Sequence, residues 1–306
     1  VEISDRDYIK NNRNFNFLSI KKDFQKYIIE VFKNYNPDLF FFGHSQNIDP
    51  STIDELKSIN KNLIISHWNE DPLMNGLAFS EKNITNIKRY ADIVDHNFVT
   101  THPTVFKNKF KSKNFHFFFI PVDQNIECYK VYNLSPKNDI FYAMSHGVNR
   151  GVLKKGFEDN RINFLESLIT KIPEINYDFH GFHNRQPIWG NDFNEAIINS
   201  KMGLNLSRGK PTKYYTSNRI ASILGNGLLT FVDKKTHLND FFSKDEIIFY
   251  DNIDDLSSKI KFYSKNDKLR KKIAKNGKTK YFKLFNETKI SKYFVDVSLG
   301  NKASLY

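Results

Sequence analysis

Residues 200–233, SKMGLNLSRGKPTKYYTSNRIASILGNGLLTFVD, decide the fold that this sequence predicts. An apolar run at 202–206 is typical of a short strand, and a basic loop follows it at 207–215. The pattern then indicates a helix over 216–224, which two glycines end. The unbroken apolar run 228–232 is typical of a strand buried on both faces of a parallel sheet. The basic loop therefore follows the carboxyl end of a strand, where open α/β sheets bind ligands.

The start of this helix favours an anion. Thr216, Ser217 and Asn218 are good N-cap residues, and the unpaired N–H groups of a helix N-terminus attract negative charge. Four cations accompany them in the sequence: Arg208, Lys210, Lys213 and Arg219. Together with the loop residues Ser207 and Tyr215, these side chains make a candidate site for a diphosphate.

Arginine is scarce in this chain and is concentrated in the same region. Only nine of the 46 basic residues are Arg, and five of the nine lie between positions 150 and 219: Arg150, Arg161, Arg185, Arg208 and Arg219. The guanidinium group binds phosphate or carboxylate in a bidentate geometry that Lys cannot reproduce. The alternative is that these cations only belong to a solvated loop. The placement of the few arginines favours recognition.

Length and composition favour a globular protein with two α/β domains. The 306 residues suffice for two cores, and 40% of them are hydrophobic. No apolar run in the sequence is long enough for a membrane-spanning helix. Cys128 is the single cysteine, so an internal disulfide framework is excluded. The first residues carry no hydrophobic leader, and we expect a cytoplasmic protein.

The net charge of +12 and the isoelectric point near 9.4 suggest an anionic partner. Codon usage is another cause, because AT-rich DNA favours the Lys, Asn, Ile, Phe and Tyr that fill this chain. No zinc-ligand spacing or RNA-binding aromatic signature accompanies the charge, so we expect no nucleic-acid partner. Peripheral contact with the anionic inner face of the cell membrane stays open, since many weak attractions add up there.

Apolar runs and helical patterns alternate along the whole chain, as in βαβ units. We expect strands at 39–42, 63–66, 93–99, 115–120, 140–144, 175–180, 202–206, 228–232 and 247–250. We expect helices at 21–34, 51–59, 81–90, 161–171, 193–199, 216–224, 253–264, 267–285 and 288–297, and one that begins near Pro103. The predicted fold class is α/β, with two Rossmann-like domains.

A polar, irregular stretch at 121–138 separates the two halves. We expect an N-terminal domain at 1–130, a C-terminal domain at 131–286 and a last helix at 287–306. Right-handed crossovers gather the loops that follow the strands at one edge of each domain. We therefore predict that the two domains face each other across a cleft lined by these polar loops.

At this point the chain resembles the GT-B glycosyltransferases, in the branch of the spore-maturation glycosyl-transferase-like proteins and the group 1 transferases. The similarity is strongest from 139 to 281, and its main carriers are DIFYAMSHGVNR at 139–150, INYDFHGF at 175–182, SKMGLNLSRG at 200–209 and YTSNRIASILGNGLLTFVD at 215–233. Weaker similarities lie in the first half: NPDLFFFGHS at 36–45, IISHWNEDP at 64–72 and FIPVD at 119–123.

The resemblance implies a nucleotide-diphosphate sugar held by the C-terminal domain and a glycan or lipid-linked acceptor held mainly by the N-terminal domain. It also implies that the last helix packs back toward the N-terminal domain. Gly147, Asn149 and Arg150 would line the first donor loop. The residues around the diphosphate and ribose would be Arg208, Lys213, Thr216, Ser217 and Arg219. Bacterial relatives commonly build surface polysaccharide or lipopolysaccharide, which is the role we expect.

Sugar transfer needs positive charge on the departing diphosphate and, for inversion, a base for the acceptor hydroxyl. Arginine and helix N–H groups can supply the charge. Since the sequence has no HExxH motif, cysteine pair or calcium loop, we expect no metal and no cofactor besides the co-substrate. The candidate bases are Asp71, Glu70 and His44. Asp71 also has the features of a turn residue before a proline, and His44 can simply end a strand.

Ser222 departs from the family pattern, because group 1 relatives carry a glutamate at this position, three residues after the arginine. That glutamate usually contacts the ribose or the sugar of the donor. An alternative function is therefore a nonenzymatic nucleotide-sugar or glycan-binding protein on the same scaffold. A further alternative is a glycoside hydrolase that uses Glu70 and Asp71, although adjacent residues rarely face one ligand.

Overall fold

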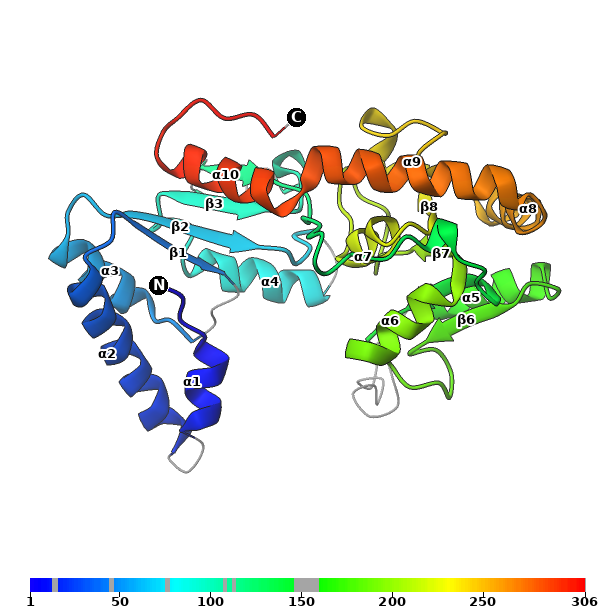
Figure 1. Ribbon diagram of the computed structural model, residues 1–306. Helices are drawn as coiled ribbons and strands as arrows, with labels where there is room; N and C mark the ends of the chain where they lie inside the picture. The colour runs from blue at the N-terminus through cyan, green and yellow to red at the C-terminus, as the bar shows by residue number, and fades with distance from the viewer. Residues whose placement is uncertain are drawn as a thin grey trace. The chain divides into compact units, whose positions relative to one another are not determined.

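The computed structural model describes residues 1–12, 16–43, 47–74, 78–106, 109–111, 114–145 and 160–305. These residues form two compact units, each of which is described by itself (Figure 1). Unit 1 contains Val1–Phe118 and Lys292–Ser304, and unit 2 contains Phe119–Ser291. The expected boundary at residue 130 therefore lies inside unit 2.

Within its described residues, unit 1 is built on a four-stranded parallel sheet with the order β1-β2-β3-β4. The strands are β1 (Leu39–Gly43), β2 (Ile64–Asn69), β3 (His96–Val99) and β4 (Phe115–Phe117). The helices are α1 (Asp5–Asn11), α2 (Phe17–Tyr35), α3 (Pro50–Ile59), α4 (Ala78–Lys88), the 3-10 turn η1 (Pro103–Val105) and the later part of α10 (Glu287–Ser298).

The long helix α2 packs on this sheet through one apolar face. Phe24, Ile28 and Phe32 recur at spacings of four and are all buried in the core of unit 1. They meet Phe42 of β1 and Ile65 of β2 in that core. The helical spacing of apolar residues in the sequence thus corresponds to a buried helix face.

Residues near the end of the chain complete the core of unit 1. The ring of Phe294 in α10 lies 4.4 Å from that of Phe98 and 5.2 Å from that of Phe41, measured between ring centroids. The hydroxyl groups of Ser298 and Ser66 lie 2.7 Å apart in a buried hydrogen bond. A segment far along the sequence therefore covers strands β1, β2 and β3.

The described part of unit 2 holds a five-stranded parallel sheet with the order β6-β5-β7-β8-β9. The strands are β5 (Asn138–Ala143), β6 (Tyr177–His180), β7 (Ser200–Asn205), β8 (Leu229–Asp233) and β9 (Ile248–Tyr250). The helices are α5 (Asn160–Lys171), α6 (Gly190–Ile198), α7 (Arg219–Gly225), α8 (Ile253–Lys265) and α9 (Asp267–Phe285), with 3-10 turns η2 (Val131–Asn133), η3 (Lys234–Thr236) and η4 (Leu238–Asp240).

Both faces of this sheet are buried. Ile140 and Tyr142 of β5 belong to a core with residues of α5 and α8. Phe141 and Ala143 of the same strand belong to another core, with residues of α6 and α7. Because successive strand residues point to opposite faces, helices cover the sheet on two sides, as the continuous apolar runs of the sequence predict.

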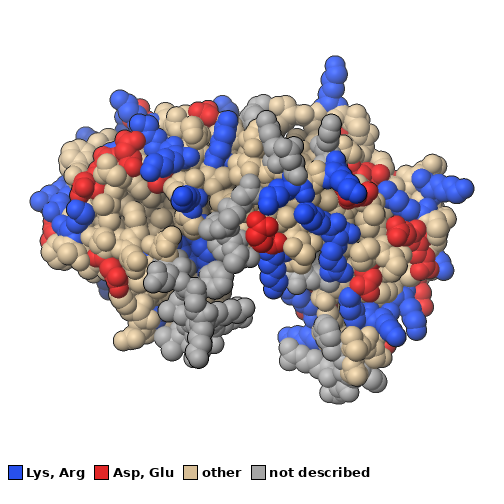
Figure 2. All heavy atoms as spheres, turned by 180° about the vertical axis from the view of Figure 1, so that it is seen from behind, with Lys and Arg blue, Asp and Glu red and all other residues tan. Residues whose placement is uncertain are grey.

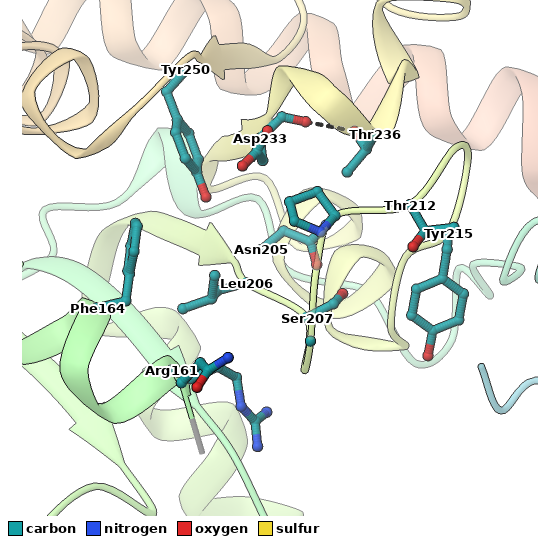
Figure 3. Close-up of a pocket in the computed structure, with 13 residues that line it drawn as sticks. Arg161, Phe164, Asn205, Leu206, Ser207, Thr212, Tyr215, Asp233, Thr236 and Tyr250 are labelled. Atoms are coloured by element: carbon teal, nitrogen blue, oxygen red, sulfur yellow. Dashed lines mark hydrogen bonds between the residues drawn. The ribbon is translucent and has the colours of Figure 1, made fainter. Parts of the chain in front are cut away.

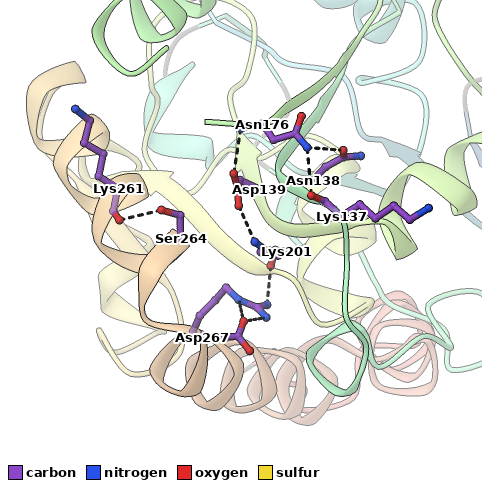
Figure 4. Close-up of polar contacts among 9 residues, drawn as sticks. Lys137, Asn138, Asp139, Asn176, Lys201, Lys261, Ser264 and Asp267 are labelled. Atoms are coloured by element: carbon purple, nitrogen blue, oxygen red, sulfur yellow. Dashed lines mark hydrogen bonds and ion pairs between the residues drawn. The ribbon is translucent and has the colours of Figure 1, made fainter. Parts of the chain in front are cut away.

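A chain of polar contacts fixes the amino ends of three strands in unit 2 (Figure 4). The Asp139 carboxylate accepts a hydrogen bond from the backbone N–H of Asn176 at 3.0 Å and from the Lys201 ammonium at 2.8 Å. The fully buried Arg270 of α9 donates to the Lys201 carbonyl at 3.1 Å and pairs with Asp267. These contacts lie at the end of the sheet opposite to the carboxyl ends of the strands, where the loops of the candidate site begin.

The segment that follows Phe118 belongs to unit 2 because α9 holds its backbone. The Lys278 ammonium donates to the carbonyl groups of Glu127 at 2.6 Å and of Tyr129 at 3.0 Å. The buried hydroxyl of Tyr281 donates to the Ile120 carbonyl at 2.8 Å. Residues 119–130, which we had expected in the N-terminal domain, are thus part of the C-terminal unit.

Several helix starts differ from the sequence expectations. Helices α2, α4 and α6 begin three or four residues earlier than expected, at Phe17, Ala78 and Gly190. The segment after Pro103 is only a 3-10 turn, in which the His102 ring accepts from the N–H of Thr104. Helix α7 begins at Arg219, three residues later than expected. Asn218, one of the three expected capping residues, is at the N-cap position, but its side chain makes no capping hydrogen bond. The Ser217 hydroxyl accepts a hydrogen bond from the Arg219 guanidinium instead.

No helix in the described ranges is long and apolar enough to cross a membrane.

Two neighbouring histidines in unit 1 should make the folded protein less stable at acidic pH. His96 Nδ1 and His116 Nε2 lie 3.1 Å apart, and burial lowers the pKa of His116 to about 4. The unfolded chain therefore binds a proton between pH 6.5 and 4 that the folded chain does not, and stability falls as the pH drops through this range. We expect a loss of about 1–3 kcal/mol in the free energy of unfolding, measured by urea denaturation.

The variant His116→Gln should show a smaller loss over the same pH range. The matched control is His183→Gln, because the His183 side chain is 54% exposed and outside unit 1. An unchanged pH dependence in His116→Gln would contradict this account of the pair.

Candidate functional site

A pocket of about 160 Å³ lies at the carboxyl ends of the strands of unit 2. Its walls come from the start of α5, from the ends of β7, β8 and β9, and from the loop before α7 (Figure 3). The lining residues are Asn160, Arg161, Phe164, Asn205, Leu206, Ser207, Gly209, Pro211, Thr212, Tyr215, Asp233, Thr236 and Tyr250. The pocket therefore occupies the sheet edge at which parallel α/β sheets bind ligands.

Arg219 holds the ends of two neighbouring strands together beside this pocket. Its Nε donates to the Ala143 carbonyl at 2.8 Å, and its Nη1 donates to the Leu206 carbonyl at 2.9 Å. The guanidinium carbon lies 4.6 Å from the centroid of the Tyr142 ring. The sequence predicted Arg219 beside a diphosphate, whereas these contacts direct much of its hydrogen-bonding capacity to backbone carbonyls after β5 and β7.

Arg161 brings a cation to the pocket wall. It is the second residue of α5 and is only 7% exposed. Its Nη1 lies 3.4 Å from the hydroxyl of Tyr142, whose own proton goes to the Leu206 carbonyl at 3.0 Å. Figure 3 shows Arg161 and Ser207 at the same side of the pocket. This side combines a positive charge with a hydroxyl group, which suits an anionic ligand.

The other side of the pocket carries polar groups that are buried. Asn205 is 5% exposed and Tyr250 is 1% exposed, and among the described residues neither Asn205 Oδ1 nor the Tyr250 hydroxyl has a hydrogen-bond partner. Burial also raises the pKa of Asp233, whose Oδ1 accepts from the backbone N–H of Lys235 at 2.8 Å. An unpaired buried polar group lowers the stability of the fold by roughly 1–3 kcal/mol. A ligand that forms hydrogen bonds with Asn205 Oδ1 and the Tyr250 hydroxyl would remove this penalty.

The remaining donor-site candidates of the sequence lie in or near the same loop. Tyr215 is buried and lines the pocket, and Thr216 is buried beside it. Arg208 is half-buried, and Asn218 is exposed at the start of α7. The Lys213 ammonium lies 4.8 Å from the ring centroid of Tyr214. The structure thus brings Arg161, Ser207 and Tyr215 to one pocket, with Arg208 and Lys213 in the loop that borders it.

Three predicted residues of the first donor loop, Gly147, Asn149 and Arg150, lie outside the described residues. The same is true of His44. Their assignments stay predictions.

The two candidate bases that the structure describes follow β2 in unit 1. Glu70 and Asp71 are both half-buried. The Asn69 amide donates to the Asp71 carbonyl at 3.1 Å, and the Thr100 hydroxyl donates to the Glu70 carbonyl at 2.8 Å. These bonds fix the backbone of the loop at the carboxyl end of the sheet in unit 1. The role of either side chain as a base stays a prediction.

The sequence analysis missed Asn205, Asp233 and Tyr250. Each is the last residue of an apolar strand. Asn205 and Tyr250 fell inside the expected strands 202–206 and 247–250, and Asp233 followed the expected strand 228–232 without being considered as a site residue. A polar residue that closes an apolar run was the available signal, because the carboxyl ends of parallel strands meet at one edge.

Within the described residues, no group of three or more His, Cys, Asp or Glu side chains is arranged to hold a metal ion.

Comparisons with known proteins agree with this architecture. Residues 161–293 match a family model described as glycosyl transferase-like. Sucrose-phosphate synthase from Thermosynechococcus elongatus superposes with a TM-score of 0.58 over 92% of this chain and 78% of that chain, at 10% identity. Anabaena HepE in complex with UDP and glucose gives a TM-score of 0.56 over 92% and 82%, at 11% identity. TarM of S. aureus gives 0.54 over 85% and 54%, at 10% identity.

A search of curated protein sequences found no match. At the identities given above, the solved structures establish a shared fold of two Rossmann-like domains.

The contacts of Arg219 predict that its removal destabilises the protein. Arg219→Ala leaves the carbonyls of Ala143 and Leu206 without these donors, and hydrogen bonds from a charged group contribute about 1.5–3 kcal/mol. We expect a melting temperature several degrees below that of the wild type, measured by differential scanning fluorimetry without ligand. Arg6→Ala is the control, because Arg6 is exposed on α1. Equal melting temperatures for Arg219→Ala and the wild type would contradict the assigned role.

Proposed function

We propose that this chain is a glycosyltransferase, and we propose its donor, its acceptor class and its chemistry. The family match over residues 161–293 and the GT-B fold shared with the structural neighbours support this proposal. The protein transfers a sugar from a nucleotide-diphosphate sugar to a glycan or lipid-linked acceptor. The role is the assembly of bacterial surface polysaccharide or lipopolysaccharide.

The pocket of unit 2 supports the placement of the donor. It combines the buried cation of Arg161 with the hydroxyl groups of Ser207 and Thr212 and with the backbone at Gly209. Such groups stabilise the charge that develops on a diphosphate as it leaves. Arg208 and Lys213 belong to the same loop and add positive charge next to it. We assign the diphosphate to this cationic side of the pocket.

Uridine diphosphate is the nucleotide that we propose. Two of the solved structures that share the fold contain it: HepE, in complexes with UDP and with UDP-glucose, and TarM, in a complex with UDP.

The reaction passes through a transition state with positive charge on the sugar ring and negative charge on the leaving diphosphate. We propose that the cations of the loop neutralise the second charge and that no metal ion is needed. For an inverting reaction, Asp71 or Glu70 of unit 1 would accept the proton of the acceptor hydroxyl, with His44 as the other candidate.

Peripheral contact with a membrane is part of this proposal, because a lipid-linked acceptor lies at a membrane surface. Figure 2 shows Lys and Arg side chains distributed over the face of the molecule seen from behind, with Asp and Glu among them. The net charge of +12 favours an anionic surface.

Ser222 favours a second candidate function. Its carbonyl accepts from the Asn226 amide at 2.9 Å, and its short hydroxyl side chain replaces the glutamate that group 1 relatives use on the donor. A protein that binds nucleotide sugars without turnover would have the same pocket.

Nucleotide release separates the two functions. The protein is incubated with UDP-glucose, UDP-galactose, UDP-N-acetylglucosamine and GDP-mannose, with and without bacterial glycans or lipid extracts, and free nucleotide diphosphate is measured. We expect release that depends on an acceptor and that persists in EDTA. Tight binding without release in any mixture would support the binding protein, and loss of release in EDTA would contradict a metal-free reaction.

Arg208 provides a direct test of the cationic side. Arg208→Ala removes a candidate phosphate ligand, and we expect nucleotide binding to weaken by about 1–3 kcal/mol, or roughly five- to 150-fold in Kd. The measurement is isothermal titration calorimetry with the nucleotide sugar that the wild type binds. Lys244→Ala is the matched control, since it removes one exposed positive charge between η4 and β9. Equal affinities of the Arg208 variant and the wild type would place the diphosphate elsewhere.

A further inference from the structure

Three strand-end side chains form what we call the pocket floor: Asn205 of β7, Asp233 of β8 and Tyr250 of β9. Neighbouring positions in the sheet order β7-β8-β9 bring them together although they are far apart in the sequence. Figure 3 shows the Tyr250 hydroxyl turned toward the space that Asp233, Asn205 and Phe164 surround. The three side chains of the floor therefore line the pocket and do not belong to the outer surface.

The floor presents several hydrogen-bond acceptors, beside the donors of the Asn205 NH2 group and the Tyr250 hydroxyl. Asn205 Oδ1 can only accept, an ionised Asp233 carboxylate can only accept, and the Tyr250 hydroxyl can accept as well as donate. Among the described residues, Asn205 Oδ1 and the Tyr250 hydroxyl are both buried without a partner. A ligand that satisfies the floor must therefore bring hydrogen-bond donors.

The Asp233 carboxylate disfavours a diphosphate at the floor. Phosphate oxygens at neutral pH are acceptors, and next to a carboxylate such as Asp233 they would be repelled. Sugar hydroxyl groups, in contrast, donate to amide and carboxylate oxygens. The pocket thus has two chemically different sides, with Arg161 and Ser207 on one side and the floor on the other.

The size and the apolar walls of the pocket fit a single ring, so the diphosphate would lie at the edge of the pocket, next to Arg161, Ser207 and the basic loop. Its volume is about 160 Å³. A cavity of about 150 Å³ is known to hold one six-membered ring, benzene. Phe164 and Leu206 add apolar surface beside the polar floor, and a sugar ring has both hydroxyl groups and apolar C–H faces.

We propose that Asn205, Asp233 and Tyr250 bind the hydroxyl groups of one sugar ring of the donor, either its ribose or the sugar to be transferred. This inference rests on the proposed function, since it takes the ligand to be a nucleotide sugar. It assigns donor specificity to residues at three strand ends, outside the basic loop that holds the diphosphate.

Because the floor holds buried polar atoms that have no partner within the described ranges, its variants should differ from ordinary core variants in their effects on stability and on donor affinity. When a side-chain group that makes a hydrogen bond in the folded protein is removed, the protein becomes less stable. When a buried group without a partner is removed, the protein does not become less stable, because the change takes away an unsatisfied polar atom. Variants of the floor should therefore bind donor less tightly while the free protein stays as stable as the wild type, or becomes more stable.

The test uses Tyr250→Phe, which removes only the hydroxyl group, and Asn205→Leu, which replaces the amide by an apolar side chain of similar size. The ligands are the nucleotide sugar of the panel above that the wild type binds most tightly, and its free nucleotide diphosphate. We expect each variant to melt at or above the wild-type temperature in fluorimetry and to bind the nucleotide sugar about tenfold more weakly in calorimetry.

Tyr281→Phe is the matched control. The Tyr281 hydroxyl is also fully buried, but it donates to the Ile120 carbonyl at 2.8 Å, away from the pocket residues. The same substitution should here have the opposite signature, with a lower melting temperature and an unchanged affinity.

The two ligands distinguish the two rings. Equal weakening for the nucleotide sugar and the free diphosphate assigns the floor to the ribose. Weakening for the nucleotide sugar alone assigns it to the transferred sugar.

Two results would overturn the inference: a melting temperature of Tyr250→Phe clearly below that of the wild type, or unchanged affinity of both floor variants for both ligands. A wild-type protein that binds no member of the panel would contradict the proposed function itself, and the assignment of the floor would fall with it.

Discussion

The arrangement of the site depends on the spacing of the strand ends β5 and β7, which the guanidinium of Arg219 bridges. It donates to the carbonyl of Ala143 on one side and to that of Leu206 on the other, and it stacks on Tyr142 between them. Because Leu206 opens the basic loop, the same contacts determine where that loop leaves the sheet. Arg219 therefore supports the backbone next to the pocket, and its expected contact with a diphosphate stays a prediction.

In the proposed site, two sets of side chains of the pocket hold different parts of a sugar nucleotide. Cations and hydroxyl donors on the α5 and loop side suit the charge of a diphosphate, and acceptors on the β8 and β9 side suit hydroxyl groups. Both sets lie at one sheet edge because all five strands are parallel. Among the described residues, Asn205 Oδ1 and the Tyr250 hydroxyl have no partner, a pattern common where polar groups are arranged in advance for a ligand.

Most of the fold was predictable from the sequence, because buried parallel strands and amphipathic helices have strong patterns. Helix α9 has the bounds expected for it, and the apolar run at 228–232 corresponds to β8, shifted by one residue. Contacts between distant residues were harder. The side-chain bond between Arg219 and Ser217 lies at the start of α7, and the pocket floor depends on the order in which the strands pair. Neither leaves a periodic signal in the sequence.

The most direct measurement is a crystal structure of the protein with the nucleotide sugar that it binds. The account predicts a diphosphate beside Arg161 and Ser207 and a sugar ring whose hydroxyl groups contact Tyr250 and Asn205. A nucleotide seated away from the carboxyl ends of β7, β8 and β9, or phosphate oxygens against Asp233, would contradict it.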